Sequence, residues 1–182
     1  NDRRSLLAQF DAARARPAGP AHDKFREVAY SLLTTNKMRE ALDVSREPLA
    51  VREKYGATLF VQSCLCARRL VEAGVPMIQA NLGNPTEWDT HYDNFGPMRK
   101  RLLPRLDQAL SALIEDMDQR GLFQDTLLVA VGEFGRSPRL GVSTSGNSNA
   151  PDGRDHWPYC YTGVIAGAGV KRGTLYGKSD DT

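Results

Sequence analysis

The sequence has little of several features that mark specialised classes of protein. Its 182 residues include only three cysteines, an odd number and too few for a disulfide-stapled scaffold. No hydrophobic run approaches the roughly 18 residues that a membrane-spanning helix requires. Charge of one sign is not in excess either, since 24 Lys and Arg residues stand against 22 Asp and Glu. We therefore expect no membrane span, and the net charge of +2 gives no electrostatic reason to expect nucleic acid as a partner.

What is present is the composition of an ordinary globular protein, with 41% hydrophobic, 25% charged and 8% aromatic residues. A chain of this length buries one substantial core. Cys64 and Cys66 are spaced too closely for a zinc knuckle, so we interpret both, together with Cys160, as small apolar core residues. The chain begins without an initiator Met and stops directly after a strand-like segment, which indicates an internal piece of a longer protein.

Apolar residues recur at helical spacing in four stretches. These are residues 2–16, 23–44, 58–74 and 97–120. A break rich in Pro and Gly at 17–20 separates the first two, and Gly121 ends the last, which is the most clearly amphipathic. We assign residues 1–56 to a helical segment and residues 57–182 to the later part of an α/β domain.

Short apolar runs bounded by Gly and Pro predict strands. They cover residues 75–82, 126–131 and 161–166, with an edge strand over 174–176. Helix 97–120 joins the first two strands without a hairpin turn, so the pattern predicts a βαβ unit with a parallel pair. The loop over 132–158 is rich in Gly, Ser and Asn, and loops of this length inside a compact domain are usually functional.

Side chains capable of chemistry stand at the ends of these predicted strands. They are Asp89 and His91 after the first strand, Glu133 and Arg136 after the second, and Arg154, Asp155 and His156 in the loop that enters the third. Ligands of open α/β sheets bind beyond the carboxyl ends of the strands. We therefore expect these residues to converge on one rim and to form a metal or anion site.

Each acid and histidine of the rim has a plausible ligand geometry. Asp89 and His91 lie on the same side of an extended chain, so that a carboxylate and an imidazole reach one cation. Asp155 either binds the same cation, if the backbone turns, or orients the ring of the adjacent His156. Glu133 is a metal ligand or general base, or it caps the glycine turn that follows it.

The two arginines of the rim have two interpretations that the sequence leaves open. A guanidinium group matches the oxygens of phosphate or sulfate two at a time, so Arg136 and Arg154 are candidate anion clamps. Alternatively, each pairs with a neighbouring carboxylate.

Four blocks of sequence, taken in order, resemble one bacterial family. They are Phe60–Val75, Trp88–Phe95, Gly132–Pro138 and Gly153–Pro158. Together they are similar to the domain-of-unknown-function 1501 family, which is often labelled sulfatase-like and related to the alkaline phosphatase superfamily.

The resemblance implies an α/β fold with a three-layer alkaline-phosphatase-like core. A helical segment would precede this core. Its mainly parallel sheet would be incomplete in this fragment and would need the rest of the same chain to complete it. The resemblance also implies a periplasmic or cell-surface location, although this stretch itself carries no export signal.

By matching position, the resemblance assigns a divalent metal ion, with zinc, calcium and manganese not distinguished. The implied ligands are Asp89, His91, Glu133 and His156, with Asp155 in addition. In a hydrolase of this kind we expect Glu133, Arg136 and Arg154 to be catalytic, with Glu133 as ligand or general base and Arg136 or Arg154 as the anion clamp. The expected substrate is a small anionic ester or a glycan sulfate.

The sequence departs from the superfamily pattern at Phe134, which stands where an adjacent Asp-His pair would supply a second histidine ligand. It also contains no nucleophile motif of the sulfatase type. Three hypotheses follow from this. The first is a metal-dependent hydrolase of phosphate or sulfate esters, and the second is a catalytically degenerate member that acts as a metal- or anion-binding surface or assembly module. The third is a purely structural rim of acid and arginine pairs.

Overall fold

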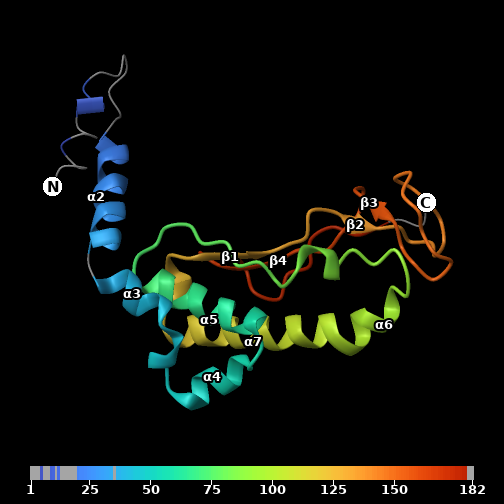
Figure 1. Cartoon of the computed structure of the whole chain (residues 1–182), viewed down its shortest axis with the longest axis horizontal. Helices are drawn as coiled ribbons and strands as arrows, with labels where there is room; N and C mark the ends of the chain where they lie inside the picture. Colours follow the sequence, from blue (N-terminus) through green and yellow to red (C-terminus); the bar gives the residue numbers. More distant parts are fainter. Residues whose placement is uncertain (1–4, 6–8, 11, 13–19, 35, 180–182) are drawn as a thin grey trace.

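The computed structural model of the chain (Figure 1) describes residues 5, 9, 10, 12, 20–34 and 36–179. Its α-helices are α2 (Pro20–Thr34), α3 (Asn36–Leu42), α4 (Leu49–Tyr55), α5 (Leu59–Glu72), α6 (Phe95–Pro97) and α7 (Leu103–Gln119). The 3-10 turns are η1 (Val44–Arg46), η2 (Pro85–Glu87) and η4 (Leu122–Gln124), and η3 (Met98–Leu102) is a π-helical turn. The strands are β1 (Leu127–Ala130), β2 (Gly135–Arg136), β3 (His156–Trp157) and β4 (Val164–Gly167).

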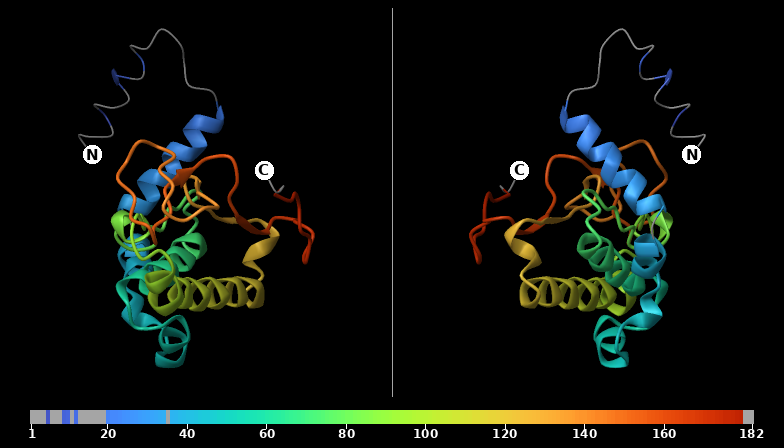
Figure 2. Two further views of the ribbon diagram at one scale, coloured as in Figure 1. Left: turned by 90° about the vertical axis from the view of Figure 1, so that its right-hand side faces the viewer. Right: turned by 90° about the vertical axis from the view of Figure 1, so that its left-hand side faces the viewer.

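The core forms where α5 and α7 pack against each other beneath the strands (Figures 1 and 2). Its buried apolar side chains are Tyr55, Val61, Cys64, Leu65, Ala109, Ala112, Leu113 and Met117. In both helices these residues recur at intervals of three and four, which places them on one face. Leu128 of β1 packs onto this cluster from the strand side.

The predicted helices over 58–74 and 97–120 are both confirmed. Helix α5 ends at Glu72, and Gly74 follows with a φ of 88°, a left-handed conformation that suits glycine. The second stretch is helical throughout but changes its winding, because α6, the π turn η3 and α7 follow one another. Pro104 lacks an N–H to donate to the preceding turn, and the widened turn lies directly before it.

The N-terminal helices differ from the prediction in their boundaries. Of the stretch 23–44, predicted as one helix, α2 and α3 cover the described residues up to Leu42, and η1 follows as a separate turn. The side chain of Asp43 accepts a hydrogen bond from Ser45 N at 3.1 Å, which starts a separate turn there. The predicted helix over 2–16 falls largely outside the described residues.

The sheets are small and antiparallel, which corrects the predicted mainly parallel core. Strand β1 pairs with β4, and β2 pairs with β3, both antiparallel. The strands predicted over 126–131 and 161–166 are therefore present, the second shifted toward the C-terminus. The fold combines helices with small antiparallel sheets, and within the described residues no three-layer parallel sheet is present.

The prediction of a strand over 75–82, and with it of a βαβ unit, is wrong. The structure shows no strand there, although Ile78, Ala80 and Leu82 are half-buried and the residues between them are exposed. Alternation reports which face of a segment is covered, whereas a strand also needs a neighbour for its backbone hydrogen bonds. The predicted edge strand over 174–176 is also absent from the described chain, and Leu175 and Tyr176 are fully exposed.

The cysteines follow the core interpretation only in part. Cys64 is buried, and its burial raises the pKa of its thiol to about 11. Cys66 is half-buried and Cys160 is exposed, so Cys160 is not the core residue that the sequence predicted.

Among the described helices, none combines the length and the apolar character needed to cross a membrane.

A buried ion-pair network ties the helices together around Arg68, whose side chain has no exposed surface. Its Nη2 lies 2.9 Å from Glu47 Oε2, its Nη1 2.6 Å from Glu72 Oε2, and its Nε 2.8 Å from Asp116 Oδ2. The hydroxyl of Tyr55 donates to the same oxygen of Asp116 at 3.0 Å. The network therefore joins α4, α5 and α7 to the end of η1.

The carboxylates of this network are held in their ionised form. Burial raises the pKa of Asp116, but hydrogen bonds from Arg120 and Tyr55 outweigh it and keep the pKa below its usual range. The hydrogen bond from Arg68 lowers the pKa of Glu47. Both carboxyl groups consequently stabilise the folded chain only while they are charged.

We predict that Arg68→Met lowers the free energy of unfolding by about 3 kcal/mol, because it removes the one fully buried guanidinium that Glu47 and Asp116 share and leaves only the more exposed Arg69 and Arg120 to compensate their charge. Urea denaturation followed by circular dichroism measures the change. Arg172→Met is the matched control, since Arg172 pairs with Asp118 on the surface and is 81% exposed. Equal losses in the two variants would show that the buried network adds no particular stability.

We also predict that the stability difference between wild type and Arg68→Met shrinks in acid. Unfolded Asp and Glu titrate near about 3.9 and 4.3. Because the folded pKa values of Glu47 and Asp116 lie lower, their contribution is complete above pH of about 5 and is lost as the pH falls through the folded values. Urea titrations from neutral pH into acid test this, and a difference that stays constant across the series contradicts it.

Candidate metal centre

Three segments bring the rim residues together at the end of the molecule that carries β2 and β3 (Figure 1). The first is the loop after η2, which contains Asp89 and His91. The other two are the paired strands β2 and β3, whose register places Arg136 opposite His156. Asn94 N donates to Asp152 O at 3.1 Å and Ala150 N to His91 O at 2.8 Å, so the loop is joined to the chain that precedes β3.

Three potential ligand atoms form a small triangle. Asp89 Oδ1 lies 3.1 Å from His91 Nε2 and 2.9 Å from His156 Nε2. The two imidazole nitrogens lie 3.2 Å from each other. Within the described residues, this is the one group of three acidic, histidine or cysteine side chains with ligand atoms close enough to hold a metal ion.

The triangle has the dimensions of a metal site. A cation with tetrahedral ligands at about 2.0–2.1 Å keeps neighbouring ligand atoms about 3.3 Å apart. The observed separations of 2.9, 3.1 and 3.2 Å lie slightly below this value. The donor set of two imidazoles and one carboxylate therefore fits a cation at its centre.

Hydrogen bonding alone does not satisfy these three atoms. Each Nε2 presents either one proton or one lone pair, and a carboxylate oxygen only accepts. Whatever the tautomers of His91 and His156, at least one of the three contacts brings two donors or two acceptors together. A bound cation removes this conflict, since all three atoms then act as electron-pair donors.

The other nitrogen of His91 faces Asp155. His91 Nδ1 is buried and has no hydrogen-bond partner within the described residues, and the closest charged atom is Asp155 Oδ1 at 3.6 Å. Asp155 is fully buried. The structure therefore places this carboxylate on the Nδ1 side of the His91 ring, away from Nε2. Asp155 thus takes the position of a residue that orients a histidine ring, as one of the two alternatives predicted, but the ring is that of His91 and not that of His156.

Asp155 also organises the loop in front of it. Its Oδ2 accepts hydrogen bonds from Thr144 N at 2.6 Å and Ser145 N at 2.8 Å, and its Oδ1 accepts from Ser145 Oγ at 2.7 Å and His156 N at 2.7 Å. Burial raises the pKa of Asp155, but these hydrogen bonds outweigh it and hold the pKa well below its usual range. The sequence analysis did not predict Thr144 and Ser145 as part of the site, although the long Ser-rich loop that contains them was recognised as a functional loop.

Arg136 fixes the position of Asp89. Its Nη2 donates to Asp89 Oδ1 at 2.5 Å and to Trp88 O at 3.0 Å, and its Nη1 donates to Arg154 O at 3.2 Å. Burial raises the pKa of Asp89, but hydrogen bonds from His156 and Arg136 outweigh it and lower the pKa. Asp89 is therefore a carboxylate at neutral pH, as a metal ligand must be.

Arg154 is engaged with backbone carbonyl groups. Its Nε donates to Ser137 O, and its Nη2 donates to Arg136 O at 3.1 Å. Arg136 therefore pairs with a carboxylate, which was one of its two predicted interpretations. Arg154 instead holds the backbone of β2. The role of either arginine as an anion clamp stays a prediction.

Glu133 and Phe134 take separate positions. Glu133 is exposed, and its carboxylate is not among the clustered ligand atoms of the described chain. Its roles as ligand and general base stay predictions. The ring of Phe134 packs on the ring of His156 with centroids 4.6 Å apart, so Phe134 supports one of the candidate ligands.

Two glycines allow the segments to approach closely. A Cβ on Gly153 would lie 1.9 Å from His91 O, and a Cβ on Gly135 would lie 1.9 Å from Cys160 O. Both glycines belong to the sequence blocks quoted above. Their need for space, rather than an unusual φ, explains why glycine stands at these positions.

We predict that Gly153→Ala displaces His91 and destabilises the chain by roughly 1–3 kcal/mol, because the methyl group overpacks the backbone contact. Thermal unfolding measures the loss. Gly132→Ala is the control, since the nearest atom to its added Cβ is Phe134 O at 3.6 Å, an ordinary contact. If both variants unfold like wild type, the close approach of Gly153 to His91 is wrong.

Comparison with known proteins gives one match. No curated protein and no solved structure matches the chain. The family profile described as Protein of unknown function (DUF1501) matches residues 2–182, which is nearly the whole chain. The family suggested by the four sequence blocks is thereby confirmed, and this chain belongs to the DUF1501 family.

Proposed function

We propose that Asp89, His91 and His156 bind a divalent metal ion and that the protein is a metal-dependent hydrolase of phosphate or sulfate esters. The triangle of ligand atoms, with sides of 2.9, 3.1 and 3.2 Å, carries the metal part of this proposal. Two imidazoles and a carboxylate suit zinc or manganese, whereas calcium prefers six to eight oxygen ligands. Zinc is therefore our first candidate among the three metals.

Asp89, His91 and His156 would hold the ion with three protein ligands, the number found in catalytic rather than structural zinc sites. A divalent ion bound there would act as a Lewis acid toward an ester oxygen and would make water nucleophilic at neutral pH.

The chain's own residues prepare the site. Arg136 holds the Asp89 carboxylate in place and ionised, because its guanidinium donates to Asp89 and to the adjacent carbonyl of Trp88. Asp155 places a buried negative charge 3.6 Å from Nδ1 of His91, which favours a proton on Nδ1 and leaves a lone pair on Nε2. Phe134 covers one side of the His156 ring.

The substrate class rests on a different basis. The resemblance of the sequence blocks suggests phosphate or sulfate esters as substrates, glycan sulfate among them. The same resemblance suggests the relation to the alkaline phosphatase superfamily and the periplasmic or cell-surface location.

A second candidate function is metal binding without turnover. Specific contacts favour it, because the guanidinium groups of Arg136 and Arg154 donate hydrogen bonds to carbonyl and carboxylate oxygens of the chain itself. If these contacts persist with substrate present, the arginines do not clamp an anion. The protein would then be a metal-binding surface or assembly module.

We predict that the purified chain binds about one equivalent of zinc and that His91→Ala and His156→Ala each weaken binding by about 100-fold or more, because each removes one of three ligands. Competition with a chromogenic chelator measures the affinity. His22→Ala is the matched control, since it removes the one other histidine of the sequence. Equal affinity in wild type and both site variants would falsify the metal site.

Hydrolysis of nitrophenyl phosphate and nitrophenyl sulfate, measured on the full-length protein with and without zinc, separates the two candidate functions. Zinc-dependent turnover that His156→Ala abolishes supports the hydrolase. Zinc binding with no turnover of either ester supports the binding module.

A further inference from the structure

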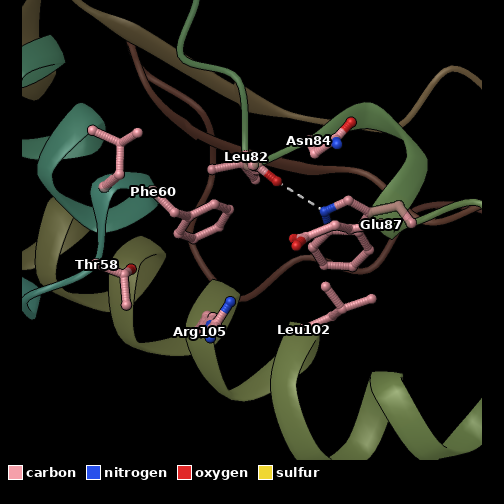
Figure 3. Close-up of a pocket in the computed structure, with 10 residues that line it drawn as sticks. Thr58, Phe60, Leu82, Asn84, Glu87, Leu102 and Arg105 are labelled. Carbon is pink, nitrogen blue, oxygen red and sulfur yellow. Dashed lines mark hydrogen bonds between the residues drawn. The ribbon is translucent and has the colours of Figure 1, made fainter.

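A small cavity lies between α5, the turn η2 and the start of α7, and nothing in the proposed metal chemistry uses it (Figure 3). Its volume is about 180 Å³. An apolar cavity of about 150 Å³ is large enough to admit benzene. The cavity therefore has room for one six-membered ring and a small substituent.

The walls of the cavity are partly aromatic and aliphatic. Phe60, Trp88, Leu82 and Leu102 line it, and Figure 3 shows Phe60, Leu82 and Leu102 around the opening. The indole N–H of Trp88 is already used, since it donates to Leu82 O at 2.9 Å. Trp88 consequently offers an apolar ring surface to an occupant rather than a hydrogen-bond donor.

One charged group in the wall has no partner among the described residues. Arg105 is half-buried and lines the cavity together with Thr58, whose hydroxyl makes no capping hydrogen bond to α5. In the part of the chain that the structure describes, no hydrogen bond or ion pair engages the side chain of Arg105. Its neighbour Arg101, by contrast, donates from Nη1 to Glu87 Oε1 at 3.0 Å.

The balance of charge in the cavity is positive. Glu87 also lines it, but Arg101 faces that carboxylate and compensates its charge. The guanidinium of Arg105 is then the uncompensated charge beside the cavity. Because a guanidinium fork matches the two oxygens of a carboxylate, the geometry selects an anion with a flat apolar body.

We propose that this cavity is a binding site for a small aromatic carboxylate, with the carboxylate on Arg105 and the ring against Phe60 and Trp88. The site differs from the metal centre in its residues and needs no metal. Trp88 directly precedes Asp89, so an occupant of the cavity contacts the residue next to a candidate metal ligand.

Isothermal titration calorimetry on the full chain tests the proposal, with benzoate as the probe. The protein is first treated with a chelator, so that benzoate does not bind through a metal. We expect saturable binding of benzoate, and binding of benzamide weaker by about tenfold or more because benzamide has the same shape without the charge. Acetate is also expected to bind more weakly, because it lacks the ring that contacts Phe60 and Trp88.

Variants assign the binding to this cavity. Arg105→Gln should weaken benzoate binding by about tenfold or more, since it removes the guanidinium from the cavity. Arg99→Gln is the matched control, because Arg99 is exposed on the neighbouring turn and does not line the cavity. Circular dichroism verifies that both variants fold, and the comparison of benzoate with benzamide on wild type does not depend on either.

Each of three results would overturn the proposal. The first is the absence of saturable benzoate binding by the wild-type chain. The second is equal affinity for benzoate and benzamide, which would show that charge is not recognised. The third is equal weakening in Arg105→Gln and Arg99→Gln, which would show a general effect of surface charge.

Discussion

The burial of one positive charge governs how the helices meet. A guanidinium removed from water needs carboxylates close by, and no single helix supplies enough of them around Arg68. Glu72 comes from the same helix, whereas Glu47 and Asp116 come from the end of η1 and from α7. The three elements therefore have to assemble together, and the apolar contacts of α5 with α7 form within that constraint.

The candidate metal centre repeats this arrangement with the opposite sign. Asp155 is a buried carboxylate, and backbone N–H groups and a hydroxyl from the loop at 144 and 145 surround it. These contacts fix the loop over 143–156, including the position of His156. Two buried charges, Arg68 in the helical core and Asp155 beside the candidate site, thus each hold together segments that are distant in the sequence.

Part of this architecture was readable in the sequence. The period of the apolar residues predicted α5 and α7, and the short runs predicted β1 and β4. The sequence also predicted that Asp89, His91 and His156 lie together, but the expected cause, the shared edge of a parallel sheet, was wrong, because the loop after η2 meets the antiparallel pair of β2 and β3 instead. The segment 75–82 was assigned wrongly because a run of apolar residues reports burial and says nothing of a hydrogen-bonding neighbour.

Other contacts could not be predicted from the sequence, because they depend on how the helices and loops are aligned in space. Arg68 follows Val61, Cys64 and Leu65 on the buried face of α5, and Asp116 stands on the buried face of α7, so charges at core positions were a visible signal. That they pair with each other depends on how the helices are aligned. The contact of Asp155 with Nδ1 of His91 likewise depends on Gly153, whose missing side chain lets two loops touch.

Strands β2 and β3, which carry Arg136 and His156, contain only two residues each. They lie apart from the helical core, and long loops make up most of their surroundings (Figure 1). Opening this region breaks few ladder hydrogen bonds and leaves α5 and α7 packed, so it costs less free energy than global unfolding. Amide hydrogens near the histidines are therefore expected to exchange with solvent faster than those of the helices, and a cation bound by the proposed ligands would slow this exchange by joining the loops.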